Sequence, residues 1–170
     1  KIDAAKSTIN WVGKKVTGEH SGTVNFQEGM LIFKGKKVVG GNFTVDMTSL
    51  TATDLTGEWK QKLDGHLKAD DFFGTDKFKT ATLKFTKIAD KGNGLYAVTA
   101  DLTIKGITNK ITFPASVQQK GGVIVAVAKG VKVDRTKFDI KYGSKSFFAS
   151  IGDKAINDDF ELDINLVAKK

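Results

Sequence analysis

The sequence predicts an all-β domain: a closed or nearly closed antiparallel barrel of about eight strands, with one helix covering an end. Three observations predict it. Apolar and polar residues alternate with a period of two along most of the chain. Short glycine-containing turn signals separate these runs, and a single segment has the period of a helix. The 170 residues fit one domain, residues 1–170.

The strands follow one another as a meander of hairpins. In "YAVTADLTIKG", Tyr96, Val98 and Leu102 fall on one face and polar residues on the other, which is typical of a half-buried antiparallel strand. Pro114 stands inside another such run, so we expect it at a sheet edge or bulge, where its missing N–H does no harm. The same alternation recurs in "NFTVDM", "TATLKF", "ITFPASV" and "FELDINLVA".

One segment, "LTGEWKQKLDGHLKA" at residues 55–69, breaks this period. Trp59, Leu63 and Leu67 fall on one face of a helix. Asp54 is the expected N-cap. A single amphipathic helix among many strands predicts a barrel with the helix at one end, and closure of the sheet removes the exposed edges of so many strands.

The histidine of this helix raises the question of catalysis. His66 falls on the apolar face, whereas Asp64 points elsewhere around the helix. Asp70 and Asp71 are expected to end the helix and cap the next turn. A metal site needs at least three converging ligands, and His20 lies far away in a strand-like stretch. His66 can therefore be structural, contact a ligand headgroup, or belong to a small hydrolase or metal protein. No metal and no cofactor is expected.

The charge and the cysteine content restrict the classes of partner. Lys+Arg number 27 against 19 Asp+Glu, a net charge of +8, which is compatible with nucleic acid, anionic lipid or a phosphorylated ligand. Arg135 is the sole arginine, and base readout relies on arginine, so we expect no nucleic-acid partner. The lysines indicate a solvated surface, with peripheral contact to an anionic membrane as an alternative. Without cysteine there are no disulfides or thiolate sites.

The aromatic residues are better placed for binding than for catalysis. The 12 phenylalanines and 2 tryptophans recur at inward-facing positions, where they either fill the core or line a cavity. A barrel of about eight strands can do either. Ala81, Ala100 and Ala115 on the same faces leave room, which favours a cavity.

Five stretches in succession resemble the signatures of the YceI-like family, across residues 5–168: "GEHSGTVNFQEGML", "GGNFTVDMTSLT", "LDGHLKADDFFGTDKFKTATLKF", "YAVTADLTIKGITNKITFPASV" and "VDRTKFDIKYG". The resemblance implies a lipocalin-like, up-and-down antiparallel barrel with a helix near one end. It also implies binding of a long apolar molecule inside the barrel, such as a polyisoprenoid or a fatty-acid derivative, and no shared enzymatic reaction.

We therefore expect a protein that binds, carries or stores a long-chain amphiphilic lipid and is not an enzyme. A structural or stress-response module that binds nothing is the alternative, and homodimer formation is left open. His66 and Arg135 are candidates for headgroup contacts, although Arg135 beside Asp134 is also typical of a structural ion pair. The predicted apolar lining comprises Trp11, Phe26, Phe43, Val45, Phe85, Val98, Leu102 and Phe113, with Trp59, Leu63, Leu67, Phe72 and Phe73 as wall or lid.

The family resemblance also implies periplasmic or secreted residence. The chain begins at Lys1 and contains no apolar run long enough for a signal peptide or a membrane span. We expect either a mature form from which a signal peptide has been removed or a trimmed sequence.

Overall fold

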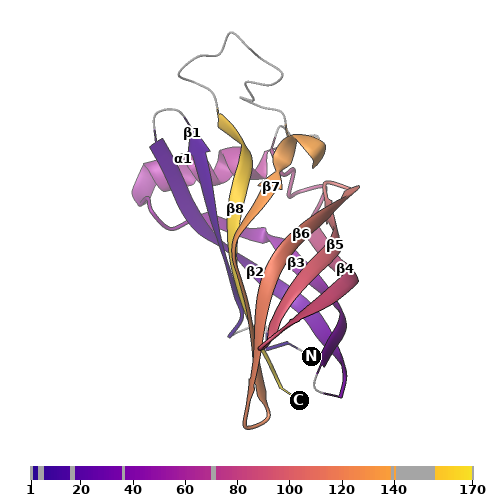
Figure 1. Cartoon of the computed structure of the whole chain (residues 1–170). Coiled ribbons are helices and arrows are strands. Elements are labelled where there is room, and N and C mark those ends of the chain that lie inside the picture. Colours follow the sequence, from indigo (N-terminus) through magenta and orange to yellow (C-terminus); the bar gives the residue numbers. More distant parts are fainter. Residues whose placement is uncertain are drawn as a thin grey trace.

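The computed structural model describes residues 2–3, 6–15, 18–35, 37–69, 72–138, 140 and 156–169. These described residues form a closed barrel of eight strands, in which each strand pairs antiparallel with the next and the last returns to the first (Figure 1). The predicted barrel with one α-helix is confirmed. In chain order the elements are β1 (Thr8–Lys15), β2 (Gly18–Lys34), β3 (Lys37–Ala52), α1 (Gly57–Lys68), β4 (Thr80–Gly92), β5 (Leu95–Ile104), β6 (Ile107–Lys120), β7 (Val123–Asp134), the 3-10 helix η1 (Arg135–Phe138) and β8 (Ile156–Lys169).

The period-two pattern places one face of each strand inside the barrel. On β5, Tyr96, Val98, Ala100 and Leu102 are buried and the residues that alternate with them are partly exposed, as predicted. Trp11 of β1 lies opposite Leu162 of β8 in the pairing that closes the sheet. Within the described part of the chain, no helix is long and apolar enough to cross a bilayer.

The pairing between β6 and β7 is short. β6 pairs with β7 only over residues 116–120, and the upper part of β6 lies against η1, where the Asn109 amide donates to the carbonyl of Lys137 at 2.7 Å. Pro114 lies two residues beyond the β7 pairing. Its missing N–H therefore removes no hydrogen bond to β7, as the sequence predicts.

Inward-facing aromatic rings lie across glycines of the neighbouring strands. A Cβ on Gly41 would lie 2.9 Å from Cδ2 of Phe85, closer than such atoms approach in proteins. The missing side chain thus leaves the space that the ring occupies. The three such pairs are Trp11 with Gly22, Phe43 with Gly29 and Phe85 with Gly41.

The helix α1 lies across the upper end of the barrel, and both termini lie at the lower end (Figure 1). It begins two residues later than predicted, at Gly57. The predicted N-cap, Asp54, is wrong: Thr56 occupies the N-cap position, and Oδ2 of Asp54 lies 2.9 Å from Nδ1 of His20. Gly57 has a φ of 63°, a left-handed conformation that delays the first regular turn.

Asp64 anchors α1 to the end of β3. Its carboxylate accepts hydrogen bonds from the Thr51 hydroxyl at 2.6 Å and from the backbone N–H of Ala52 at 2.8 Å. The Lys60 ammonium lies 3.2 Å from the same carboxylate. Partial burial raises the pKa of Asp64, but the hydrogen bonds from Thr51, Ala52 and Lys60 outweigh burial and lower the pKa below its usual value. The ionised carboxylate is therefore the form that the fold favours.

Replacing Asp64 by asparagine is expected to lower the free energy of unfolding at neutral pH by about 1 kcal/mol, because a partly solvated carboxylate with several donors is lost. The pKa is lower in the folded state, so the carboxylate contributes fully above about pH 4 and loses this contribution as the pH falls through the folded-state pKa. Urea unfolding at several pH values should show the difference between wild type and Asp64→Asn shrinking in acid. A difference that stays constant would contradict this assignment.

Replacing Gly41 by alanine is expected to lower the free energy of unfolding by about 1–3 kcal/mol, since the new methyl group must push the Phe85 ring aside. Gly65→Ala on α1 is the matched control. Open space surrounds a Cβ at Gly65, so alanine should stabilise the helix by up to about 1 kcal/mol. Urea unfolding midpoints measure both effects, and equal responses of the two variants would refute the packing argument.

Candidate ligand-binding site

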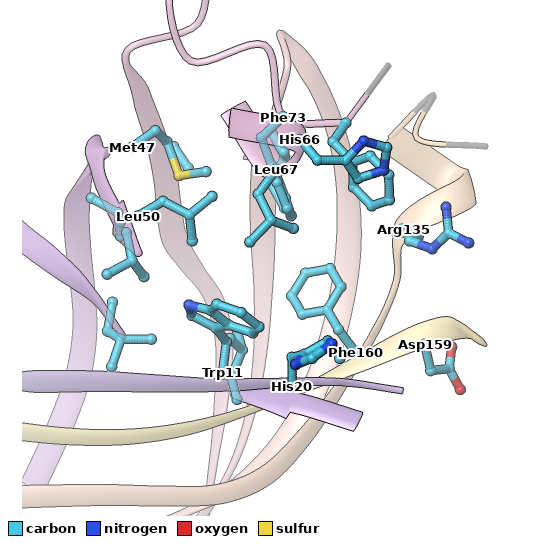
Figure 2. Close-up of a pocket in the computed structure, with 18 of the residues that line it drawn as sticks. Trp11, His20, Met47, Leu50, His66, Leu67, Phe73, Arg135, Asp159 and Phe160 are labelled. Atoms are coloured by element: carbon cyan, nitrogen blue, oxygen red, sulfur yellow. The ribbon is translucent and has the colours of Figure 1, made fainter. Parts of the chain in front are cut away.

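A cavity of about 300 Å³ lies inside the barrel at the end covered by α1. We call this space the upper chamber. Figure 2 shows Leu67 and Phe73 entering it from the helix side, across from Trp11 of β1. Its volume lies at the lower end of the range of pockets that hold drug-sized ligands, roughly 300–1,000 Å³. The interior at this end is therefore open rather than filled.

Three of the polar side chains that line the upper chamber lie toward one side. Figure 2 shows His66, Arg135 and Asp159 there, with Met47 and Leu50 on the opposite side. The rest of the lining is almost entirely apolar. The chamber is thus apolar over nearly all of its surface, with a few polar side chains at its edge. We call its polar side chains the polar rim: Lys14, His20, His66, Arg135, Asn157 and Asp159.

Phe72 joins α1 to η1 at this rim. Its ring centroid lies 4.6 Å from that of His66, and the Arg135 guanidinium carbon lies 5.5 Å from the centroid of the same ring. The next residue, Phe73, meets Phe160 of β8 edge-on at 6.0 Å. Aromatic pairs of this kind contribute about 0.5–1.5 kcal/mol each. The segment after α1 is therefore held against the opposite side of the barrel.

Arg135 is a buried cation beside the chamber, with 3% of its surface exposed. Its Nε donates to the carbonyl of Asn157 at 2.9 Å, and its Nη1 donates to the carbonyl of Ile140 at 2.8 Å. Burial lowers the pKa of the guanidinium, and the carboxylates of Asp158 and Asp134 oppose this effect. Because arginine is so basic, the group stays protonated at neutral pH. It therefore supplies a fixed positive charge at the rim.

His20 has both a structural contact and a place in the lining. It pairs with Asp54, and the neighbouring Ser21 carbonyl accepts a hydrogen bond from the Thr53 N–H at 3.0 Å. These contacts tie the start of β2 to the loop before α1. The structural interpretation of His20 agrees with this geometry, whereas its position on the chamber wall was not predicted.

A second, smaller cavity of about 90 Å³ lies deeper in the barrel. We call it the lower chamber. It shares Ile9, Val45, Leu102 and Leu162 with the lining of the upper chamber, so the two spaces adjoin. Its volume is well below that of ordinary ligand pockets. The interior is thus wide near α1 and narrow toward the termini.

The rings of four phenylalanines occupy much of the space around the lower chamber. We call Phe26, Phe43, Phe85 and Phe113 the phenylalanine cluster. The Phe43 ring lies 6.1 Å from Phe26 and 5.4 Å from Phe85, and Phe85 lies 6.4 Å from Phe113. The contacts run through side chains of β2, β3, β4 and β6. These rings pack against one another, and the cavity that they help to line holds only about 90 Å³.

The residues predicted from the sequence fall into three groups. Trp11, Leu63, Leu67, Phe72, Phe73, His66 and Arg135 line the upper chamber. Phe26, Phe43, Phe85, Val98 and Phe113 line the lower chamber. Val45 and Leu102 line both. Trp59 lines neither.

The prediction that Trp59 walls the chamber is wrong. Its side chain is 71% exposed, and the Lys62 ammonium lies 5.2 Å from its ring centroid. Trp59 is in the first turn of α1, and helical side chains lean toward the helix N-terminus. Its indole therefore extends past the beginning of the helix instead of over the barrel.

Several lining residues were not predicted from the sequence. Phe160 and Leu162 belong to an alternating run that was already assigned to the inward face, and this run was the signal that could have identified them. Asn157 and Asp159 lie in the first residues of β8 and carry no comparable pattern. His20 and Asp159 reach the chamber only because β1 joins β2 and β8 in one sheet.

The geometry around His66 gives little support to the catalytic and metal hypotheses. Among the described residues, no group of three or more His, Cys, Asp or Glu side chains is placed to hold a metal ion. Asp70 and Asp71, which these hypotheses combine with His66, lie outside the described residues. Their predicted role in capping the turn after the helix therefore lies outside the described residues as well.

Comparisons with known proteins agree with this architecture. The model of the YceI-like domain matches residues 1–168. A UPF0312 protein of Vibrio parahaemolyticus is 33% identical over 134 residues, which are 74% of this chain and 68% of that protein. A UPF0312 protein of Shewanella denitrificans is 34% identical over 100 residues, 59% of this chain. The match spans half of the Shewanella protein's length, 50%.

Two solved structures share the fold over nearly the whole chain. BcnA of Burkholderia cenocepacia superposes with a TM-score of 0.79 at 22% identity, covering 99% of this chain and 100% of that one. A polyisoprenoid binding domain of Saccharophagus degradans, implicated in plant cell wall breakdown, superposes with a TM-score of 0.71 at 18% identity, covering 99% and 96%. The family match and the shared barrel lead to one conclusion: the chain belongs to the YceI-like family.

Proposed function

We propose that the protein binds, carries or stores a long-chain amphiphilic lipid, such as an isoprenoid or a fatty-acid derivative, with part of its apolar chain in the upper chamber. One observation carries this proposal: the chamber is apolar inside and has a few polar groups, with His66, Arg135 and Asp159 toward one side (Figure 2). An amphiphile has the same division. The polyisoprenoid binding domain of the Saccharophagus protein, which shares the fold, supports the same class of ligand.

Burial of the apolar chain supplies the affinity in this proposal. Each methylene moved from water into the chamber contributes about 0.8 kcal/mol. Several methylenes together exceed the cost of ordering the ligand. Trp11, Met47 and Leu50 form part of the surface that would receive them.

The polar rim favours an anionic headgroup. Arg135 is a buried cation, and Lys14 and His66 stand on the same rim. Asp159 on the rim and the Asp134 and Asp158 carboxylates beside Arg135 oppose them. A carboxylate or phosphate at the rim would meet the Arg135 guanidinium in a partly desolvated place, where charges interact more strongly than in water.

The proposal assigns no reaction to the protein. No serine, threonine or cysteine occurs among the described residues that line the upper chamber, so these residues supply no hydroxyl or thiol nucleophile beside His66. A His66→Ala variant that keeps lipid binding would leave the hydrolase and metal hypotheses without support. Lipid binding lost together with a hydrolytic activity would favour them.

Periplasmic or secreted residence and contact with an anionic membrane belong to the same proposal. Trp59 is exposed and Lys62 lies over its ring. Tryptophan and lysine are residues that membrane interfaces favour. Together with the net charge of +8, they support collection of the ligand at a membrane surface by the helix end of the barrel.

Trp11 can report binding directly. It is buried in the chamber wall at 7% exposure, and Trp59→Phe makes it the only tryptophan of the chain. Titration of this variant with a fatty acid should change the intensity and wavelength of Trp11 emission in a saturable manner, because the chain displaces water beside the indole. Emission that does not respond to any amphiphile would contradict the proposed function.

The reciprocal variant, Trp11→Phe, is the control. It leaves Trp59 as the reporter on the outside of α1, so free fatty acid should leave the emission unchanged. Anionic vesicles should shift Trp59 emission to shorter wavelength, and neutral vesicles should not. An unchanged signal with anionic vesicles would refute the membrane contact while leaving ligand binding intact.

The headgroup assignment predicts a preference for charge. A fatty acid should bind at least about tenfold more tightly than the alcohol of the same chain length, a difference of roughly 1.4 kcal/mol. The preference should persist at high salt, since a buried charge is screened much less than exposed ones. Fluorescence titration of the Trp59→Phe protein measures both constants.

Two variants locate the charge responsible for this preference. Arg135→Met should remove most of the preference, whereas Lys132→Gln on the exposed side of β7 should leave it. A preference that disappears in salt and survives Arg135→Met would place the responsible charge elsewhere. Because Arg135 also holds two backbone carbonyls, thermal unfolding must accompany each titration.

A further inference from the structure

The barrel interior becomes narrower where the upper chamber meets the lower chamber. The upper chamber has about 300 Å³ and the lower chamber about 90 Å³, although the same closed sheet surrounds both. Val45 and Leu102 stand at the junction. Beyond them, the phenylalanine cluster takes up the space that an apolar chain would need to continue down the barrel.

The rings of this cluster are fixed from several sides. Phe43 is 3% exposed and lies between Phe26 and Phe85 in the chain of ring contacts. Its ring also packs over Gly29, where a Cβ would collide with it, and Phe85 packs over Gly41 in the same way. A ring held by neighbouring rings and by the backbone of the adjacent strand has little room to swing aside.

We infer that the phenylalanine cluster closes the lower end of the binding space and so sets how much of an apolar chain the protein buries. This inference rests on the proposed function. The ligand would place its chain in the upper chamber up to the cluster, and any surplus chain would remain outside the barrel. The specificity would then depend on the end of the chain nearest the headgroup rather than on total chain length.

This arrangement predicts that affinity rises with the length of the apolar chain and then reaches a plateau. For saturated fatty acids of increasing length, each added methylene should tighten binding roughly fourfold while the upper chamber fills, as 0.8 kcal/mol per methylene implies. Beyond a certain length, further methylenes have no apolar wall of the chamber to contact. The dissociation constant should then change less than about twofold with each pair of added methylenes, well below the gain per buried methylene.

Removal of one ring tests the role of the cluster. Phe43→Ala should connect the chambers and move the plateau to longer fatty acids. Because Phe43→Ala removes a buried ring and can prevent folding, Phe43→Leu provides a milder opening and should move the plateau by a smaller amount in the same direction. The probe is Trp11 emission in the Trp59→Phe background, with thermal unfolding measured in parallel.

Two alanines, one in each chamber, allow a matched pair of substitutions that fill space in the barrel interior. Ala81 lines the upper chamber and Ala126 lines the lower chamber, and both are 6% exposed. Ala81→Leu should move the plateau to shorter chains, because it narrows the space that the chain occupies. Ala126→Leu should leave the plateau where it is, because the chain does not reach the lower chamber.

The outcomes separate this inference from the proposed function. If no fatty acid of any length binds, the proposed function fails. If fatty acids bind but affinity keeps rising past the expected plateau, the inference alone fails. The inference also fails if both Phe43 variants leave the plateau in place, or if Ala126→Leu weakens long chains as much as Ala81→Leu does.

Discussion

The side chains on the inner face of the closed sheet determine how much of the barrel interior is filled. The rest of the structure depends on this packing. A barrel of eight strands is just wide enough for inward side chains to meet across it. Near the termini the phenylalanine cluster meets and fills most of the space. Near α1 the inward residues include Ala81 and Met47, and an open chamber remains. Glycines on neighbouring strands make room for the large rings.

The covered end of the barrel depends on a few polar and aromatic contacts rather than on a packed helix face. Asp64 ties α1 to β3, and Phe72 joins His66 to Arg135. No residue of α1 is fully buried. A helix held in this way covers an apolar chamber without filling it, and the Phe72 contacts lie beside the polar rim.

Much of the fold could be predicted because closure depends on a repeating local pattern. Alternation along β5 placed Tyr96 and Val98 inside, as the structure has them. The site depends on other information. Trp59 shares a helix face with Leu63 and Leu67, yet its place in the first turn of α1 leaves it facing solvent. His20 and Asp54 meet across 34 residues. The division of one inward stripe into an open chamber and a packed cluster depends on how side chains meet across the barrel, which alternation does not specify.

The central claim is that the upper chamber holds the apolar part of an amphiphile with its polar end at the rim. Native mass spectrometry of the protein purified from bacterial cells, followed by organic extraction, tests it most directly. We expect a single bound molecule per chain that is lost on extraction and that has an apolar chain and a polar end. Protein that carries no such molecule, and takes up no fluorescent lipid when one is supplied, would contradict the account.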